Sequence, residues 1–317
     1  MNIVLCTDHK FVMPCGIAIC SICVNNEDSF IHFYIITDDS ITQKDKKDLE
    51  YTAHVHDHKN DVTFLFVNEN MVSAFSWYKS GYYPKQIFYR LLMTELLPDN
   101  IDKVLYLDCD IIVRKSLSSL WNIELGDNYI GAAPDGFSGI LYTYNRLKYS
   151  ITLGYFNSGV MLVNVFLWKK RYVLKRLIEY MDKNKIRIIL GDQDPMNFLF
   201  KDNKVHIPLT YNVQPSYLYL EKYMQMSIYQ FKEELEEARH DPAILHYAGC
   251  RPWEKGCKHP FKNIFGKYKD MTIWKNEISR EVKKTFKIKI LSLLKYILIW
   301  FGICHQIDYF DKGLHLD

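Results

Sequence analysis

The sequence predicts an α/β fold built on a Rossmann-like, mostly parallel sheet. Short apolar runs alternate with longer helical segments through the N-terminal half, which indicates parallel strands joined by right-handed crossovers. Hydrophobic residues make up 48% of the 317 residues, so a sizeable core is expected. This length suits one large domain of about 250 residues with an appendage.

The elements follow from the lengths and boundaries of the apolar runs. The predicted strands are, in order, Asn2–Thr7, Phe30–Thr37, Val62–Val67, Lys103–Leu107, Tyr129–Ala133 and Tyr155–Val165. The predicted helices are Val12–Val24, which is rich in small residues, Lys44–His56, Gln86–Leu97, which Pro98 ends, and Trp168–Asn184.

Charge and cysteine usage exclude some classes of protein. The chain has 40 basic and 37 acidic residues, a balance that argues against a nucleic-acid binder. Most of the eight cysteines lie in apolar runs, and the start of the chain does not resemble a signal peptide, so we expect reduced thiols and a cytoplasmic location. The Cys20–Cys23 spacing favours the packing face of a buried helix over a redox motif.

Two carboxylates at positions i and i+2 follow the apolar strand that ends at Leu107. The chain lacks both GxGxxG and GxxxxGK[ST], so a bound diphosphate would need another partner, and a divalent cation held by Asp108 and Asp110 supplies one. A solvated turn is the alternative. Asp8 also follows a strand, and ligands of parallel sheets bind beyond such strand ends, so we expect Asp8 and Asp108 to face one crevice.

A second polar cluster lies in the segment Leu245–Trp253. His246 is a candidate third metal ligand, although a core histidine with satisfied hydrogen bonds is the alternative. Gly249 would let the backbone approach a phosphate closely, and Arg251 would hold that phosphate by charge-assisted hydrogen bonds.

Polar residues at two further places are candidates for binding or catalysis, and a third place is not. Asp192, Gln193 and Asp194 precede or open a helix that has Pro195 in its first turn, and Asp194 is alternatively a helix cap. Asn157 interrupts an apolar strand, where a buried amide needs a partner such as a ligand hydroxyl. The histidines of the segment His54–His58 are better explained by a solvated loop than by a metal site.

Taken in order, these segments resemble glycosyltransferase family 8, and most closely its bacterial lipooligosaccharide α-galactosyltransferases and lipopolysaccharide glucosyltransferases. The matching stretches are IVLCTD, FYRL, KVLYLDCDIIV, LWNIELGDNYIGAAPD, YFNSGVMLVN, DQDPMN and HYAGCRPW. The resemblance covers residues 1–265, which we treat as a nucleotide-sugar glycosyltransferase catalytic domain; residues 266–317 then form a helical tail.

The resemblance implies a type-A glycosyltransferase fold, retention at the anomeric carbon, and manganese as cofactor, with magnesium as the alternative. The metal ligands that it implies are Asp108, Asp110 and His246. It further implies that Asp8 binds the uracil and that Arg90 lies by the diphosphate and the donor sugar. Asp135 would lie near the acceptor.

The reacting sugar would meet a third group of residues, by the same resemblance. Asn157 and Asp192 would bind donor-sugar hydroxyls, and Gln193 would lie beneath the anomeric carbon. Gln193 is a poor nucleophile because an amide carries no full charge, whereas Asp192 and Asp194 are stronger ones. Same-face attack, with the leaving diphosphate oxygen as base, is the alternative that we favour.

The predicted function is therefore transfer of galactose or glucose from a UDP-sugar to a glycan acceptor, of lipopolysaccharide type or another cell-surface glycan. One alternative is a phosphohydrolase of the haloacid dehalogenase type, because VLYLDCDII resembles its nucleophile strand. Another is a non-catalytic UDP-sugar-binding protein. Two departures from the family are Arg251, where the family has lysine, and Lys10, where close relatives have asparagine.

The tail is basic and then apolar. Ile290–Cys304 carries a single charge, that of Lys295, and is shorter than the roughly 20 residues that span a bilayer as a helix. One interpretation is a helix packed on the catalytic domain or on another subunit. The other is a peripheral anchor whose lysines meet anionic lipid on the inner face of the plasma membrane, close to a lipid-linked acceptor.

Overall fold

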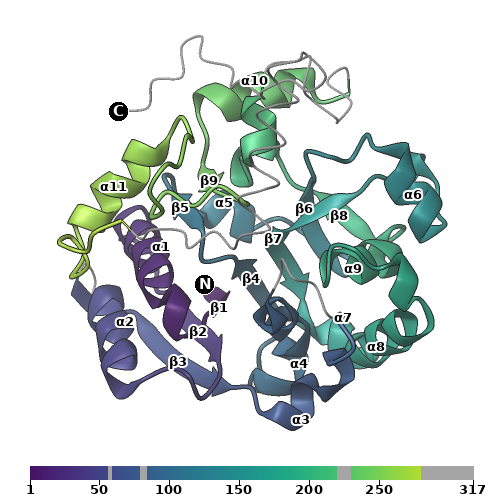
Figure 1. The fold of residues 1–317 in the computed structure, drawn as a ribbon, viewed down its shortest axis with the longest axis horizontal. Coiled ribbons are helices and arrows are strands. Elements are labelled where there is room, and N and C mark those ends of the chain that lie inside the picture. Colours follow the sequence, from purple (N-terminus) through teal and green to yellow (C-terminus); the bar gives the residue numbers. More distant parts are fainter. Residues whose placement is uncertain (56–58, 79–83, 220–229, 280–317) are drawn as a thin grey trace, which may run out of the picture.

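A seven-stranded sheet runs through the centre of the protein (Figure 1). The computed structural model describes residues 1–55, 59–78, 84–219 and 230–279. The sheet has the order β3-β2-β1-β4-β7-β6-β8. Its strands are β1 (Asn2–Cys6), β2 (His32–Thr37), β3 (Asp61–Phe66), β4 (Lys103–Leu107), β6 (Ile130–Pro134), β7 (Phe156–Asn164) and β8 (Lys204–His206). Only β7 runs against its neighbours, β4 and β6, so the predicted mostly parallel sheet is confirmed.

A separate two-stranded antiparallel ribbon joins β5 (Ile111–Val113) to β9 (Ile244–His246). The helices are α1 (Val12–Val24), α2 (Gln43–Val55), α3 (Glu69–Val72), α4 (Met93–Leu96), α5 (Ser118–Trp121), α6 (Leu141–Leu147), α7 (Val165–Lys170), α8 (Val173–Lys183), α9 (Gln193–Phe200), α10 (Lys232–His240) and α11 (Lys262–Asp270). Short 3-10 turns include η1 (His9–Phe11), η3 (Lys85–Leu92), η6 (Leu209–Tyr211) and η7 (Pro215–Leu218).

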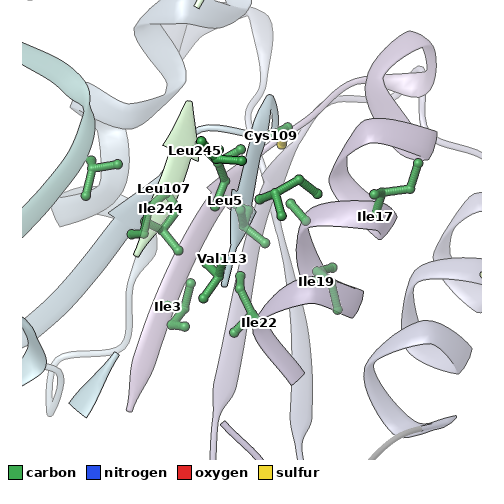
Figure 2. Packing of buried hydrophobic residues seen from close by; sticks show 14 of the residues in the cluster. Ile3, Leu5, Ile17, Ile19, Ile22, Leu107, Cys109, Val113, Ile244 and Leu245 are labelled. Carbon is green, nitrogen blue, oxygen red and sulfur yellow. The ribbon is translucent and has the colours of Figure 1, made fainter. Parts of the chain in front are cut away.

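Both faces of the sheet are covered, because successive residues of the central strands enter different cores. In β1, Ile3 and Leu5 pack with α1 and with the β5–β9 ribbon, whereas Val4 packs with the core beneath α7, α8 and α9. Figure 2 draws the first of these cores, with Ile19 and Ile22 of α1. A strand buried on both faces reads as a continuous apolar run, which is why these strands were predictable.

Helix α1 matches its prediction, and 12 of its 13 residues are buried. Cys20 and Cys23 are among them and form no disulfide, which confirms the packing interpretation. Two other helices differ from expectation. The segment Gln86–Leu97 is mostly the 3-10 turn η3 followed by the short α4, and five consecutive residues of η3 are buried, so no single face points to the core. The segment Trp168–Asn184 is divided between α7 and α8 at Tyr172, which has a left-handed φ of 49°.

The folded unit continues past residue 265. Helix α11 spans that position, and Trp274 beyond it is buried in the core against α1. Within the described ranges, no helix combines the length and apolar character needed to cross a membrane. The histidines of segment 56–58 and the basic, apolar stretch from Lys283 lie outside the described residues.

The packing of α1 against Trp274 gives a stability prediction. A Cβ on Gly16 would lie 2.1 Å from the Trp274 ring, so Gly16→Ala should lower the free energy of unfolding by about 1–3 kcal/mol through overpacking. The matched control is Gly266→Ala in α11, where nothing lies within 4 Å of the added carbon. That change should be neutral or stabilising by about 0.5–1 kcal/mol, because alanine favours helix. Urea unfolding measures both, and equal effects would contradict the packing.

Candidate active site

The pairing of β5 with β9 brings His246 beside the Asp108–Asp110 segment. In this ribbon His246 lies opposite Ile111, the residue that follows Asp110. The backbone of Tyr247 also donates a hydrogen bond to the Asp110 carbonyl at 2.8 Å. Residues far apart in the sequence therefore meet at the C-terminal end of β4, where ligands of such sheets bind.

Three ligand atoms converge at this strand end. His246 Nε2 lies 3.3 Å from Asp110 Oδ1 and 3.7 Å from Asp108 Oδ2. The other oxygen of Asp108 is held from behind, by Arg90 Nη2 at 2.9 Å and the Tyr106 hydroxyl at 2.7 Å. Asp108 therefore keeps one oxygen turned toward His246. The ligand atoms of this trio lie within 4.8 Å of one another, which is suitable for a shared metal ion.

The donor set fits a divalent cation of intermediate hardness. One imidazole nitrogen and two carboxylates suit manganese, and carboxylates alone would suit magnesium. Burial lowers the pKa of His246, but the neighbouring Asp110 and Asp108 outweigh this effect and raise that pKa above its ordinary value. Burial likewise raises the pKa of Asp110, yet the charge of His246 leaves it below the usual range. The two carboxylates thus favour positive charge at this position, which a bound cation would supply.

Gly159 on β7 keeps this space open. A Cβ there would lie 2.2 Å from His246 Cε1 and 2.7 Å from Asp108 Oδ2. The strand is fixed in place because the Asp108 amide donates to the Gly159 carbonyl at 2.8 Å. Any larger residue at this position would displace one of the two ligands.

The site has a second end, formed by Asp8 and the loop after His246. Asp8 follows β1, which neighbours β4 in the sheet, and its carboxylate accepts a hydrogen bond from the Phe11 amide at 3.0 Å. The Arg251 guanidinium lies over the Phe11 ring, 5.2 Å from its centroid, and pairs with Glu254. Gly249 has a φ of +73°, a conformation that favours glycine. Asp8 and Arg251 therefore flank the same turn, η1.

Arg90 connects the metal-ligand end to Asp192. Its Nη1 donates to the Ser158 carbonyl at 2.8 Å, and its Nε lies 3.2 Å from Asp192 Oδ2. The guanidinium stacks on the Tyr106 ring, and the neighbouring carboxylates keep its pKa well above the ordinary value although burial opposes this. Burial raises the pKa of Asp192 to about 6, with Arg90 acting in the opposite direction. The nitrogens of Arg90 thus all face protein groups.

Asp135, Asn157 and Gln193 form one hydrogen-bonded group. Asp135 Oδ2 accepts from Asn157 Nδ2 at 3.0 Å and from Gln193 Nε2 at 3.2 Å. Gln193 Oε1 in turn accepts from the Ser158 amide at 3.0 Å, and Asp135 Oδ1 accepts from the Phe137 amide. Both ends of the Gln193 amide are therefore engaged by protein groups, and its side chain is held in one orientation.

Asp194 lies apart from these residues. It is completely buried, and Arg146 binds it with both terminal nitrogens, while Tyr155 donates to it at 2.8 Å. The amides of Ile189 and Leu190 also donate to it. The helix cap predicted here is wrong, because α9 already begins at Gln193 and the Asp194 carboxylate serves the preceding loop.

Three residues of the site escaped sequence analysis. Tyr106 and Ser158 lie inside motifs that were singled out, but an apolar strand context hides their contacts to Asp108 and Asp192. Asn212 contacts His246 at 2.8 Å and has no local signal, since it follows an ordinary turn. The one local indication for Tyr106 is its spacing: it stands two residues before Asp108, and in an extended chain side chains two residues apart point to the same face.

The amino-acid sequence also matches a known protein family. The model of glycosyl transferase family 8 matches residues 2–257. The chain therefore belongs to this family, as its motifs predict, and it is a glycosyltransferase. This membership excludes the haloacid-dehalogenase-type alternative, whose nucleophile strand resembles β4 only locally.

Individual relatives are similar over most of the chain. General stress protein A of Bacillus subtilis is 28% identical over 86% of this chain and 94% of its own length. The lipopolysaccharide glucosyltransferase WaaO of Escherichia coli is 28% identical over 87% of this chain and 79% of its own. The crystal structure of galactosyltransferase LgtC, bound to donor and acceptor sugar analogues, superposes with a TM-score of 0.76 at 24% identity, covering 86% and 96% of the two chains. The type-A fold is thus confirmed.

The space that Gly159 leaves open beside His246 and Asp108 predicts that a larger residue there weakens manganese binding. Gly159→Ala would push its Cβ into the His246 ring, so we expect manganese affinity to fall at least about tenfold, a loss of ~1.4 kcal/mol. Titration calorimetry with MnCl₂ measures the affinity, and circular dichroism checks the fold. Gly266→Ala serves as the control that leaves the site untouched. Unchanged affinity in Gly159→Ala would mean that the cation binds elsewhere.

The raised pKa of Asp192 predicts that the free energy of unfolding depends on pH. Its native pKa of about 6 exceeds the ordinary 3.8, so the folded protein binds a proton more tightly than the unfolded chain. The stabilisation from this proton is complete below pH 3.8 and is lost as pH rises through 6. Asp192→Asn removes the titration, so wild type should gain about 2 kcal/mol relative to that variant between pH 8 and pH 4.5. Urea unfolding at both pH values checks this, and a difference that grows with pH would contradict it.

Proposed function

We propose that this glycosyltransferase moves galactose or glucose from a UDP-sugar to a glycan acceptor, with retention of configuration and with a divalent cation. The observation that carries the proposal is the convergence of Asp108, Asp110 and His246 at the end of β4, with Asp8 beyond the neighbouring strand end. Transfer from a nucleotide diphosphate requires stabilisation of the leaving anion, and a cation held by these three side chains would provide that stabilisation.

Asp108, Asp110 and His246 would hold manganese, with magnesium as the alternative. The bound cation would act as a Lewis acid on the departing diphosphate. Arg251, on the rim beside Phe11, would add a positive charge on the same side, and Gly249 would let the backbone approach a phosphate.

Asp8 would bind the uracil, and Asn157 and Asp192 would bind hydroxyls of the donor sugar. Asp135 would lie at the acceptor side. Arg90 supports this arrangement by holding Asp108 and Asp192, since its nitrogens already face protein groups. Relatives named as a glucosyltransferase and a galactosyltransferase are consistent with either hexose.

The surroundings of the candidate nucleophiles favour same-face attack. Asp194 is completely buried and accepts five hydrogen bonds. Gln193 carries no full charge, and both ends of its amide are engaged. Asp192 faces Arg90 and Ser158. The acceptor hydroxyl would therefore lose its proton to the leaving diphosphate oxygen and attack from the face that this oxygen vacates.

A lipopolysaccharide-type or other cell-surface acceptor, reached at the cytoplasmic side of the membrane, completes the proposal. The relative WaaO is named a lipopolysaccharide glucosyltransferase, which supports this acceptor class. The basic tail from Lys283 would bring the enzyme to anionic lipid, as its composition suggests.

A donor screen tests the proposal. Purified protein with manganese should release UDP from UDP-galactose or UDP-glucose in a coupled assay, and the product should keep the α configuration by NMR. Asp108→Asn, Asp110→Asn and His246→Ala should each lower the rate about a thousandfold, equivalent to ~4 kcal/mol. The control is Asp241→Asn, an exposed carboxylate paired with Lys115.

Each alternative has its own signature in this screen. Full activity in the presence of a chelator would remove the cation from the mechanism. Tight UDP binding without turnover of any UDP-hexose would indicate a binding protein. A β-linked product would overturn retention.

A further inference from the structure

Asn212 is completely buried between His246, a candidate metal ligand, and the hydrogen-bonded group of Asp135, Asn157 and Gln193. Its Oδ1 is 2.8 Å from His246 Nδ1, and its Nδ2 is 3.0 Å from Asn157 Oδ1. The chain next to it is fixed, because His246 donates its backbone N–H to the Val213 carbonyl at 3.0 Å. This pairing alongside β9 sets the Asn212 side chain against the imidazole.

The direction of each hydrogen bond in this chain is determined from its ends. The Gly159 amide can only donate, and it reaches Asn157 Oδ1 at 3.0 Å. The Asp135 carboxylate accepts, and it receives Asn157 Nδ2. The Asn157 amide therefore has one orientation, with its oxygen toward Asn212. Asn212 must then present its NH₂ group to Asn157, which leaves its oxygen facing His246.

An oxygen facing Nδ1 requires that nitrogen to carry the proton. The neutral imidazole has one N–H and one lone pair, so the lone pair belongs to Nε2. Nε2 is the atom that faces Asp110 and Asp108 at 3.3 and 3.7 Å. Because Nδ1 keeps its proton, Nε2 is the nitrogen that offers a lone pair to a cation whenever the ring is neutral.

We propose that Asn212 is a positioning residue that fixes the tautomer and ring orientation of His246 for cation binding. Asp135 orients the Asn157 amide by a hydrogen bond, and Asn157 in turn orients the Asn212 amide. The inference rests on the proposed metal-dependent function. Partners behind a ligating histidine commonly affect metal affinity by about 10- to 100-fold. Without Asn212, Nδ1 would lose its acceptor, and the other tautomer would donate its proton toward Asp110.

Two variants separate the hydrogen bond from packing. Asn212→Leu has a similar shape and offers no acceptor, so manganese affinity measured by calorimetry should fall about 10- to 100-fold. Asn212→Asp keeps an acceptor facing Nδ1 but loses the NH₂ group that donates to Asn157, so its manganese affinity should fall clearly less than that of Asn212→Leu. Asn26→Leu is the control, a buried asparagine that binds Ile22 and Leu117 instead. It should lose stability without losing manganese affinity.

A second readout follows the tautomer without the metal. Spectra of ¹⁵N-histidine-labelled protein, at a pH where the ring is neutral, should assign the proton of His246 to Nδ1 in wild type and in Asn212→Asp. In Asn212→Leu the proton should move to Nε2. This assignment does not depend on turnover.

The outcomes distinguish the inference from the proposed function. If Asn212→Leu binds manganese as wild type does, or if Asn212→Asp loses as much affinity as Asn212→Leu, the inference fails. A proton on Nε2 of His246 in wild type would also overturn it. If wild type binds no manganese while the tautomer still depends on Asn212, the proposed cation fails and the tautomer assignment stands.

Discussion

Arg90 lies buried between Asp108 and Asp192, and its charge allows two carboxylates to share a site from which water is largely excluded. Isolated carboxylates in such surroundings would take up protons, as the raised pKa of Asp192 shows. The guanidinium offsets this by ion pairs of 2.9 and 3.2 Å, and it stacks on Tyr106. Removing one partner of such a group leaves an uncompensated charge, so the site is sensitive to each member.

Around this ion-paired group, the polar side chains are oriented by one another and by the backbone of β7. Ser158 and Gly159 supply the amides that orient Gln193 and Asn157, and Asp135 accepts from both of those side chains. A group that is ordered before the substrate arrives loses little freedom on binding. The antiparallel strand β7 thus acts as the scaffold for the Asp135, Asn157 and Gln193 side of the site.

The ion pair of Asp194 with Arg146 has a different place in the molecule. It ties the loop before α9 to α6. Two buried carboxylates only two residues apart thus have separate partners, since Asp192 pairs with Arg90 and Asp194 with Arg146. Local sequence does not distinguish them, because both precede or enter the same helix.

The sequence by itself determined the sheet and the family, and it indicated the three candidate metal ligands. Strands buried on both faces leave continuous apolar runs, and Asp108 and Asp110 stand immediately after one of them. Only the tertiary structure decided how β5 and β9 pair, where Arg90 points, and that Asp194 is enclosed. It also revealed Asn212, whose role depends on partners from β7 and β9. The direction of a hydrogen bond and the burial of a side chain depend on partners that are distant in the sequence. Local sequence periodicity therefore cannot predict them.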